Sequence, residues 1–132
     1  MSQGNVENVC RIYEHLNRGE IEDVVRRCSD DFVMDMSGRI FNPDTYTGHD
    51  GVRRFYADAT EAWASYRWGV EETRVRGDSV VALLHCTAQS RDAAPPVDWD
   101  VAWLWRFRGD EATSVRFYRD RAEALEAAGL SE

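Results

Sequence analysis

The side chain best suited to proton transfer near neutral pH is that of His85, which stands in the run Ser79–Ser90. This run alternates between two sets of side chains, as a strand does, and His85 shares its face with Leu83 and Thr87. Imidazole titrates near neutrality, so His85 could take part in acid–base chemistry. Alternatively, it is a core histidine whose ring bonds a neighbouring carboxylate or hydroxyl. Both interpretations stay open.

A second polar group lies on the last predicted strand, Thr113–Arg119. Arg116, Tyr118 and Asp120 alternate onto one side, which places a guanidinium, a phenol and a carboxylate in a row. This row is either a functional set or the site of a structural ion pair. In the structural case, Arg116 and Asp120 tie the strand to the helix that follows it.

Several kinds of chemistry have no support in the sequence. The three histidines lack HxH and HExxH spacing, so we expect no catalytic metal. Cys10, Cys28 and Cys86 are far apart and odd in number, which argues against a disulfide framework or a thiolate zinc site. The chain has no lysine for a Schiff base, and it has neither a glycine-rich phosphate loop nor a dinucleotide fingerprint. We therefore expect no cofactor.

The element that organises the chain is a predicted β-hairpin over Val97–Asp120. In its first arm an apolar set occupies one face of the strand: Trp99, Val101, Trp103, Trp105 and Phe107. The turn falls at 109–111, where glycine and two acidic residues interrupt the alternation. Because three of the five tryptophans share this face, other parts of the chain must cover it. We expect it to form the wall of a small-molecule cavity.

The remaining segments predict an α+β fold in a single domain, residues 1–132. Helices are predicted at Asn5–Arg18, Glu20–Cys28, Gly51–Ala64 with Asp50 as N-cap, and Arg121–Ala128. Strands are predicted at Phe32–Met36, Trp68–Arg76 and Ser79–Ser90, with a short strand pair around the turn Asn42-Pro43-Asp44. Consecutive strands joined by short turns pair antiparallel, so the helices should pack on one curved sheet.

Composition narrows the class of partner. The chain is 43% hydrophobic, which excludes disorder, and its formal net charge of −8 disfavours nucleic acid and anionic membranes. All sixteen basic residues are arginine, an indication of a GC-rich, bacterial genome. No signal peptide or long apolar stretch is seen, so we expect a soluble protein in the cytoplasm.

Four stretches carry a resemblance to a known family. They are Leu16–Glu20 at the exit of the first helix, Asp30–Asp35 in the first strand, Gly48–Val52 at the entry of the third helix, and Arg116–Leu130 at the end of the chain. In this order and spacing they resemble the NTF2-like superfamily and, within it, its SnoaL-like branch. The resemblance implies a cone: helices packed on a strongly curved, mostly antiparallel sheet that encloses a pocket.

The resemblance also implies catalytic roles. By likeness to ketosteroid isomerase, Asp35 is the general base, because a carboxylate in an apolar pocket has a raised pKa that suits proton abstraction beside a carbonyl. His85 or Tyr118 is then its proton partner. The positions of that enzyme's two oxyanion donors carry Ile12 and Trp103 here, which argues against a steroid isomerase.

Two other members suggest a different base. Asp120 resembles the late aspartate that acts as base in polyketide cyclases. Asp35, Arg116 and Asp120 could instead imitate the Asp-Arg-Asp set with which limonene-epoxide hydrolase positions a water. The fold alone does not choose between these reactions.

The same alignment implies which residues bind substrate. They are Tyr13, Tyr56, Trp63, Leu83, Thr87, Trp99, Val101 and Trp103. Such aromatic walls suit a flat polycyclic or aromatic ligand and cofactor-free isomerisation, cyclisation, dehydration or hydrolysis. The alternatives are a noncatalytic small-ligand-binding protein and a protein-interaction domain. We expect a homodimer and a small hydrophobic ligand.

Overall fold

The structure is a computed structural model that describes residues 2–39 and 43–130. In chain order the elements are α1 (Ser2–Arg18), α2 (Ile21–Val25), β1 (Cys28–Asp35), β2 (Thr45–Thr47), α3 (Gly48–Ala62), β3 (Ser65–Arg76), β4 (Ser79–Gln89), β5 (Val97–Arg108), β6 (Glu111–Tyr118) and α4 (Arg121–Ala127). Within these residues, no helix combines the length and the apolar character that a membrane span requires.

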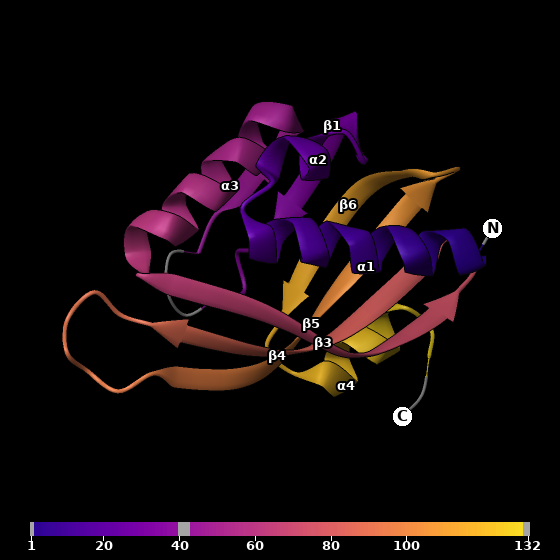
Figure 1. The fold of residues 1–132 in the computed structure, drawn as a ribbon. Helices are drawn as coiled ribbons and strands as arrows, with labels where there is room; N and C mark the ends of the chain where they lie inside the picture. Colours follow the sequence, from indigo (N-terminus) through magenta and orange to yellow (C-terminus); the bar gives the residue numbers. More distant parts are fainter. Residues whose placement is uncertain (1, 40–42, 131–132) are drawn as a thin grey trace.

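All six strands form one curved sheet in the order β2-β1-β6-β5-β4-β3 (Figure 1). The strands β3 to β6 form three consecutive antiparallel hairpins. Gly77 lies in the turn between β3 and β4 with a φ of 57°, and Gly109 lies in the turn between β5 and β6 with a φ of 64°. Among the described strands, β1 and β6 are the one parallel pair. The predicted α+β class and mostly antiparallel curved sheet are confirmed.

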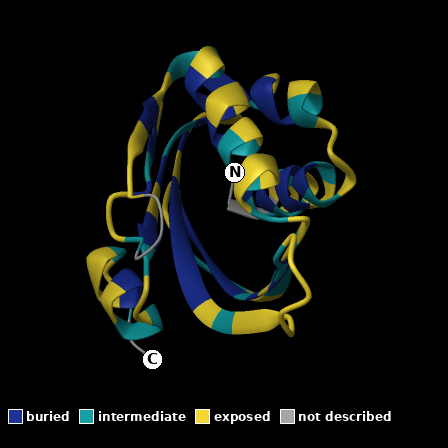
Figure 2. Cartoon of the chain, turned by 90° about the vertical axis from the view of Figure 1, so that its left-hand side faces the viewer, coloured by how far each residue is buried: buried dark blue, intermediate teal, exposed yellow. Residues whose placement is uncertain are grey.

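Helices cover the two faces of the sheet unequally. Figure 2 shows α1, α2 and α3 on the concave side and α4 alone on the convex side. The main hydrophobic core lies on the concave side and includes Ile12, Leu16, Phe55, Trp103 and Trp105. A smaller cluster on the convex side joins Leu83 and Leu104 of the sheet to Ala124 and Leu125 of α4. The same strands therefore carry two separate apolar contacts.

Two predictions around β1 and β2 differ from the structure. α2 ends at Val25 rather than at Cys28, because Cys28 already pairs with Ala112 and opens β1. The predicted strand pair near residue 42 is wrong in its pairing, since Thr45–Thr47 pairs with β1. Asn42, at the predicted turn, lies outside the described residues. Pairing across the sheet, which local periodicity does not reveal, decides these limits.

The start of α3 also differs. The helix begins at Gly48, and the N-cap position is Thr47 rather than Asp50. Asp50 lies in the first turn, where its Oδ1 accepts a hydrogen bond from Arg53 Nη1 at 2.7 Å. A carboxylate in this turn still interacts favourably with the positive end of the helix dipole. The predicted capping role of Asp50 is therefore wrong.

Candidate functional site

A cavity of about 530 Å³ opens between α3 and the concave side of the sheet, close to the end of β6. Seven aromatic side chains line it: Phe55, Trp63, Tyr66, Trp68, Trp99, Trp103 and Phe117. Ala59, Ala62 and Val101 add apolar surface, and the charged residues on the lining are Arg39, Asp58, Asp100 and Arg119. Small-molecule sites in proteins have volumes of about 300–1,000 Å³ and mostly apolar walls. The cavity has the size and lining of such a site.

The aromatic wall is preformed. The ring centroids of Trp63 and Trp99 lie 6.0 Å apart, and those of Tyr66 and Trp68 lie 4.4 Å apart, both pairs being tilted. Rings packed in this way restrict one another's rotation. Burial raises the pKa of the Tyr66 phenol well above its ordinary value, so its hydroxyl stays protonated near neutral pH.

Polar side chains gather at one part of the lining. The Tyr46 hydroxyl donates to Asp58 Oδ2 at 2.7 Å and accepts a hydrogen bond from Arg39 Nη2 at 3.4 Å. The guanidinium carbon of Arg39 lies 5.6 Å from the centroid of the Phe55 ring. Burial and the Asp58 carboxylate raise the pKa of Tyr46, so the phenol remains a neutral donor to Asp58. The cavity thus combines an aromatic wall with a carboxylate and two guanidinium groups.

Half of the predicted substrate-binding residues line this cavity. Trp63, Trp99, Val101 and Trp103 do so, the last three as expected from the alternation in β5. Trp63, predicted inside the third helix, instead follows the end of α3 at Ala62. Their inward direction follows from the register, because Val101 and Trp103 lie on the face that packs against the helices.

Tyr13 and Tyr56 do not belong to the lining. Tyr13 is fully buried in the core, where its hydroxyl accepts a hydrogen bond from Trp105 Nε1 at 2.9 Å. Tyr56 lies beside Gly19 at the end of α1, so close that a Cβ at residue 19 would stand 2.9 Å from the Tyr56 hydroxyl oxygen. Both tyrosines serve helix packing.

The predicted face of β4 is wrong. Residues paired directly across neighbouring strands share a face, and Trp99 is paired with Cys86 and Trp103 with Ala82. Leu83 and Thr87 therefore lie on the convex face, Leu83 against α4 and Thr87 exposed. Alternation did not reveal this, because Ser79–Leu84 is buried on both faces of the strand. Neither residue lines the cavity.

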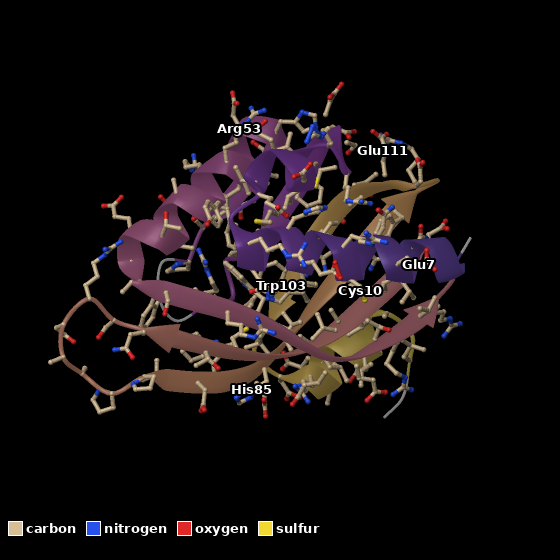
Figure 3. All side chains as sticks on the ribbon, viewed as in Figure 1. Glu7, Cys10, Arg53, His85, Trp103 and Glu111 are labelled. Atoms are coloured by element: carbon tan, nitrogen blue, oxygen red, sulfur yellow. The ribbon has the colours of Figure 1, made fainter. Side chains whose placement is uncertain are left out.

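His85 also points to the convex face, on the side of the sheet opposite Trp103 (Figure 3). Its Nδ1 lies 2.7 Å from Asp100 Oδ1, and its Nε2 lies 3.6 Å from Asp98 Oδ2. The hydrogen bond to Asp100 raises the pKa of His85 and lowers that of Asp100. The prediction that His85 faces the cavity is wrong. Its ring bonds a carboxylate, as in the alternative interpretation, but His85 lies on the solvent-exposed convex face and not in the core.

The surroundings of His85 form a charged network. Arg121 Nη2 donates to Glu71 Oε1 at 2.5 Å and to the Leu84 carbonyl oxygen at 2.9 Å, and it lies 3.6 Å from Asp100 Oδ1. Glu71, His85 and Asp100 could together offer three ligand atoms to a metal ion. Arg121 already supplies positive charge to both carboxylates, so the group is better described as an ion-pair network.

Asp35 and Arg116 lie on the convex face as well. They are paired across β1 and β6, with Arg116 Nε 3.8 Å from Asp35 Oδ2, and the Arg116 guanidinium lies over the Tyr118 ring at 5.2 Å. Asp35 Oδ1 accepts hydrogen bonds from the Ser37 hydroxyl at 2.6 Å and the Ser37 amide at 3.0 Å. These bonds lower the pKa of Asp35, with a smaller contribution from Arg116.

The predicted environment of Asp35 is therefore wrong. It does not stand in an apolar pocket, and its pKa is not raised, because Phe32 and Met34 turn inward and the alternating Asp35 must turn outward. The three residues Asp35, Arg116 and Tyr118 do come together, but none lines the cavity.

Asp120 caps a helix. Its Oδ1 accepts a hydrogen bond from the Ala122 amide at 2.9 Å at the start of α4. The alternative of an Arg116–Asp120 ion pair is not seen among the described residues, since Arg116 pairs with Asp35 instead. The predicted alternation does not extend to Asp120, because β6 ends at Tyr118 and Asp120 belongs to the start of α4.

Sequence reasoning missed four polar residues at the cavity or next to it: Arg39, Tyr46, Asp58 and Arg119. Helical spacing could have found Asp58, which lies three residues after the inward Phe55 on the same helical stripe. Arg119 also had a signal, because it continues the alternation of the inward Val115 and Phe117. Arg39 and Tyr46 had none, since they come from a loop and a three-residue strand.

Comparisons with known proteins agree with this geometry. The model of the SnoaL-like domain matches residues 9–115 of the chain. A search of curated proteins gives no significant match.

Several solved structures share the architecture of this chain. A protein from Jannaschia sp. CCS1, assigned provisionally as a SnoaL-like polyketide cyclase, is 20% identical, with a TM-score of 0.76 and coverage of 100% of this chain and 96% of the other. TerC, co-crystallized with polyporic acid, is 21% identical, with a TM-score of 0.78 and coverage of 95% and 97%. A protein with a ketosteroid isomerase-like fold from Catenulispora acidiphila DSM 44928, in complex with trimethylamine, is 19% identical, with a TM-score of 0.78 and coverage of 94% and 93%. At these identities the likeness shows a shared fold.

Proposed function

Since this chain belongs to the SnoaL-like domain family, we propose that it binds a flat, hydrophobic aromatic molecule in the cavity beneath α3. The observation that carries the proposal is the space left inside the cone: about 530 Å³ remains between seven aromatic side chains. Had the tryptophans filled the cone, no ligand could enter. Binding by TerC of polyporic acid and by the Catenulispora acidiphila protein of trimethylamine supports a ligand in this fold.

The five tryptophans provide a direct test with its own control. Trp63, Trp68, Trp99 and Trp103 line the cavity, whereas Trp105 is fully buried in the core and does not. We expect that titration of 5-fluorotryptophan-labelled protein with two- and three-ring aromatic compounds shifts the four cavity ¹⁹F resonances. The Trp105 resonance should stay in place. Single Trp→Phe variants assign the five signals.

A pair of variants measures the contribution of the aromatic wall to ligand affinity. Trp99→Ala removes a half-buried indole from the cavity and should weaken binding at least about 10-fold, because aromatic contacts dominate such sites. Thr87→Ala, on the convex face of the neighbouring strand, should leave affinity unchanged. Binding that is equal in both variants, or ¹⁹F shifts confined to Trp105, would rule the cavity out as the site.

A second candidate function is acid–base catalysis on the bound ligand, and Asp58 favours it. Its carboxylate lines the cavity, and the Tyr46 hydroxyl donates to only one of its oxygens, Oδ2. A carboxylate held in this way can take a proton from a carbon beside a carbonyl, the step common to isomerisation and cyclisation. Asp58 thus takes the role that the family resemblance assigned to Asp35.

Proton exchange tests this role without a known product. We expect the protein to accelerate deuterium incorporation from D₂O beside the carbonyl of a bound aromatic ketone. Asp58→Asn should lower that rate about 100-fold, the contribution typical of a general base. Asp35→Asn, on the convex face, is the matched control and should change nothing. Equal exchange rates in the Asp58→Asn variant and the native protein would contradict catalysis by Asp58 and would not affect the binding proposal.

We also propose, from the sequence, that the chain forms a homodimer and acts in the cytoplasm. Analytical ultracentrifugation at micromolar concentration measures the first, and fractionation of the source cells measures the second. The binding proposal is argued independently of both, from the cavity lining.

A further inference from the structure

The cavity has a charge opposite to that of the protein around it. The chain carries a formal net charge of −8, yet two of the four charged residues on the described lining are arginines, Arg39 and Arg119. Of the two acidic residues, Asp100 directs its carboxylate to His85 on the convex face. Asp58 is therefore the one carboxylate of the described lining that can balance two guanidinium groups. The cavity is locally cationic in an acidic protein.

The backbone brings both arginines to the same part of the cavity. Gly38 packs against the end of β6, and a Cβ at this position would stand only 3.3 Å from the Phe117 carbonyl oxygen. Arg39 directly follows Gly38, and Arg119 lies two residues after Phe117. The close approach of these two segments places both arginines beside the Phe117 edge of the aromatic wall.

The two arginines differ in what they contact. Arg39 is held by the Tyr46 hydroxyl and the Phe55 ring. Arg119 makes no hydrogen bond or ion pair with any residue that the structure describes. Its backbone is nevertheless well positioned, because β6 ends at Tyr118 and Asp120 caps α4. Arg119 is thus a positioned guanidinium on the cavity lining with its donors available to a ligand.

From this arrangement we infer that the ligand is an aromatic anion whose rings contact the tryptophans and whose negatively charged oxygens bind Arg119 and Arg39. The inference rests on the proposed binding function and specifies its ligand class. A guanidinium has five N–H donors and no acceptor, remains charged at all physiological pH values, and matches a carboxylate in a two-bond geometry. A neutral ring compound would leave the Arg119 donors without a charged partner among the residues that the structure describes.

A pair of ligands of equal shape tests the inference. Naphthalene-2-carboxylate and naphthalene-2-carboxamide, with the corresponding anthracene pair for a larger ring system, differ mainly in charge. We expect the native protein to bind each carboxylate at least about 10-fold more tightly than its amide, measured by calorimetry and by the ¹⁹F tryptophan shifts. The preference should shrink as ionic strength rises, because salt screens the arginine charges.

Arg119→Gln is the decisive variant, since Arg119 is exposed and its loss should not affect folding. It should reduce the preference for the carboxylate to less than about 3-fold and leave the affinity for the amide unchanged. Arg39→Gln should act in the same direction. Arg67→Gln removes the same charge from the exposed face of β3, opposite Thr87, and should leave the preference intact.

The outcomes separate the two proposals. If carboxylate and amide bind equally well and both shift the cavity tryptophans, the protein binds aromatic molecules and the inference about charge is overturned. A preference for the carboxylate that persists in both arginine variants also overturns it. If no compound of either pair shifts the cavity tryptophans, the binding proposal fails and the inference fails with it.

Discussion

The concave and convex faces of β4, β5 and β6 consist of the same strands, yet they differ in almost every physical property. On the concave face Trp103, Trp105 and Phe117 build a core and a cavity wall. On the convex face the same strands carry ion pairs, His85 with Asp100 and Arg116 with Asp35 of β1. In the described part of the chain, the apolar cluster of that face lies beneath α4.

This difference separates the candidate site from the ion-paired face of the same sheet. The polar residues that seemed best suited to chemistry, Asp35 and His85, lie on the convex face, where Ser37 and Arg116 contact Asp35 and Asp100 bonds His85. The cavity instead takes its polar groups from segments outside the regular strands, such as Arg39 and Arg119. Loops and connections commonly carry binding residues that a rigid sheet positions. Four substitutions test the comparison, in order of decreasing expected effect.

The largest effect should come from the concave core. Trp105→Ala removes a fully buried indole that stacks on Phe32 and donates to the Tyr13 hydroxyl. We expect a loss of about 3–5 kcal/mol in the free energy of unfolding, from the cavity left behind and the unpaired hydroxyl. Urea denaturation followed by circular dichroism measures it. A loss below about 1 kcal/mol would contradict the placement of Trp105 in the core.

The convex apolar cluster should contribute less. Leu83→Ala leaves a void between β4 and α4, and we expect a cost of about 2–3 kcal/mol in the free energy of unfolding. Ligand affinity should not change, because Leu83 faces away from the cavity. A variant that keeps its stability but loses ligand binding would restore the original prediction that Leu83 binds substrate.

Asp120 should behave as a cap rather than as a base. Asp120→Ala removes the acceptor for the Ala122 amide, and we expect a loss of about 1 kcal/mol in the free energy of unfolding. Asp120→Ser, which retains an N-cap oxygen without a carboxylate, should recover most of it. The deuterium exchange described above should be the same in both variants. Exchange that falls in Asp120→Ser would indicate a catalytic carboxylate.

The smallest effect should be the pH dependence from the His85–Asp100 pair. The hydrogen bond that His85 donates to Asp100 raises the pKa of His85, so its stabilisation is complete below the ordinary histidine pKa and is lost as pH rises through the raised value. The same bond lowers the pKa of Asp100, so stabilisation is also lost as pH falls through that lowered value. The difference in thermal midpoint between the native protein and His85→Gln should therefore peak near about pH 5. A difference that grows towards pH 9 would contradict this assignment.

Regular periodicity made much of the fold predictable. The alternation in β5 correctly turned Trp99, Val101 and Trp103 inward, and the helical spacing of Ile12 and Leu16 correctly placed α1 against the sheet. These patterns work because one side of each element is buried and the other is not.

Where both sides of an element are buried, or where no regular element exists, hydrophobic periodicity does not indicate which side chains face the core. β4 is apolar on both faces, so only its pairing with β5 reveals that Cys86, and not His85, lies beside Trp99. The alternation in β1 did separate Asp35 from the inward Phe32 and Met34. The resemblance to ketosteroid isomerase nevertheless assigned Asp35 to the pocket, and the residue pattern was the better indicator.

The sequence by itself determined an α+β fold with a tryptophan-bearing strand face, because these depend on residue types and local spacing, and the resemblance to the NTF2-like superfamily implied the cone. It also excluded lysine chemistry, since the chain has no lysine. Only the tertiary structure decided which face of β4 is inward, which carboxylate reaches the cavity, and that Arg39 and Arg119 lie on its lining. Strand register and the close approach of Gly38 to Phe117 bring together residues about 80 positions apart, and no local pattern encodes such contacts.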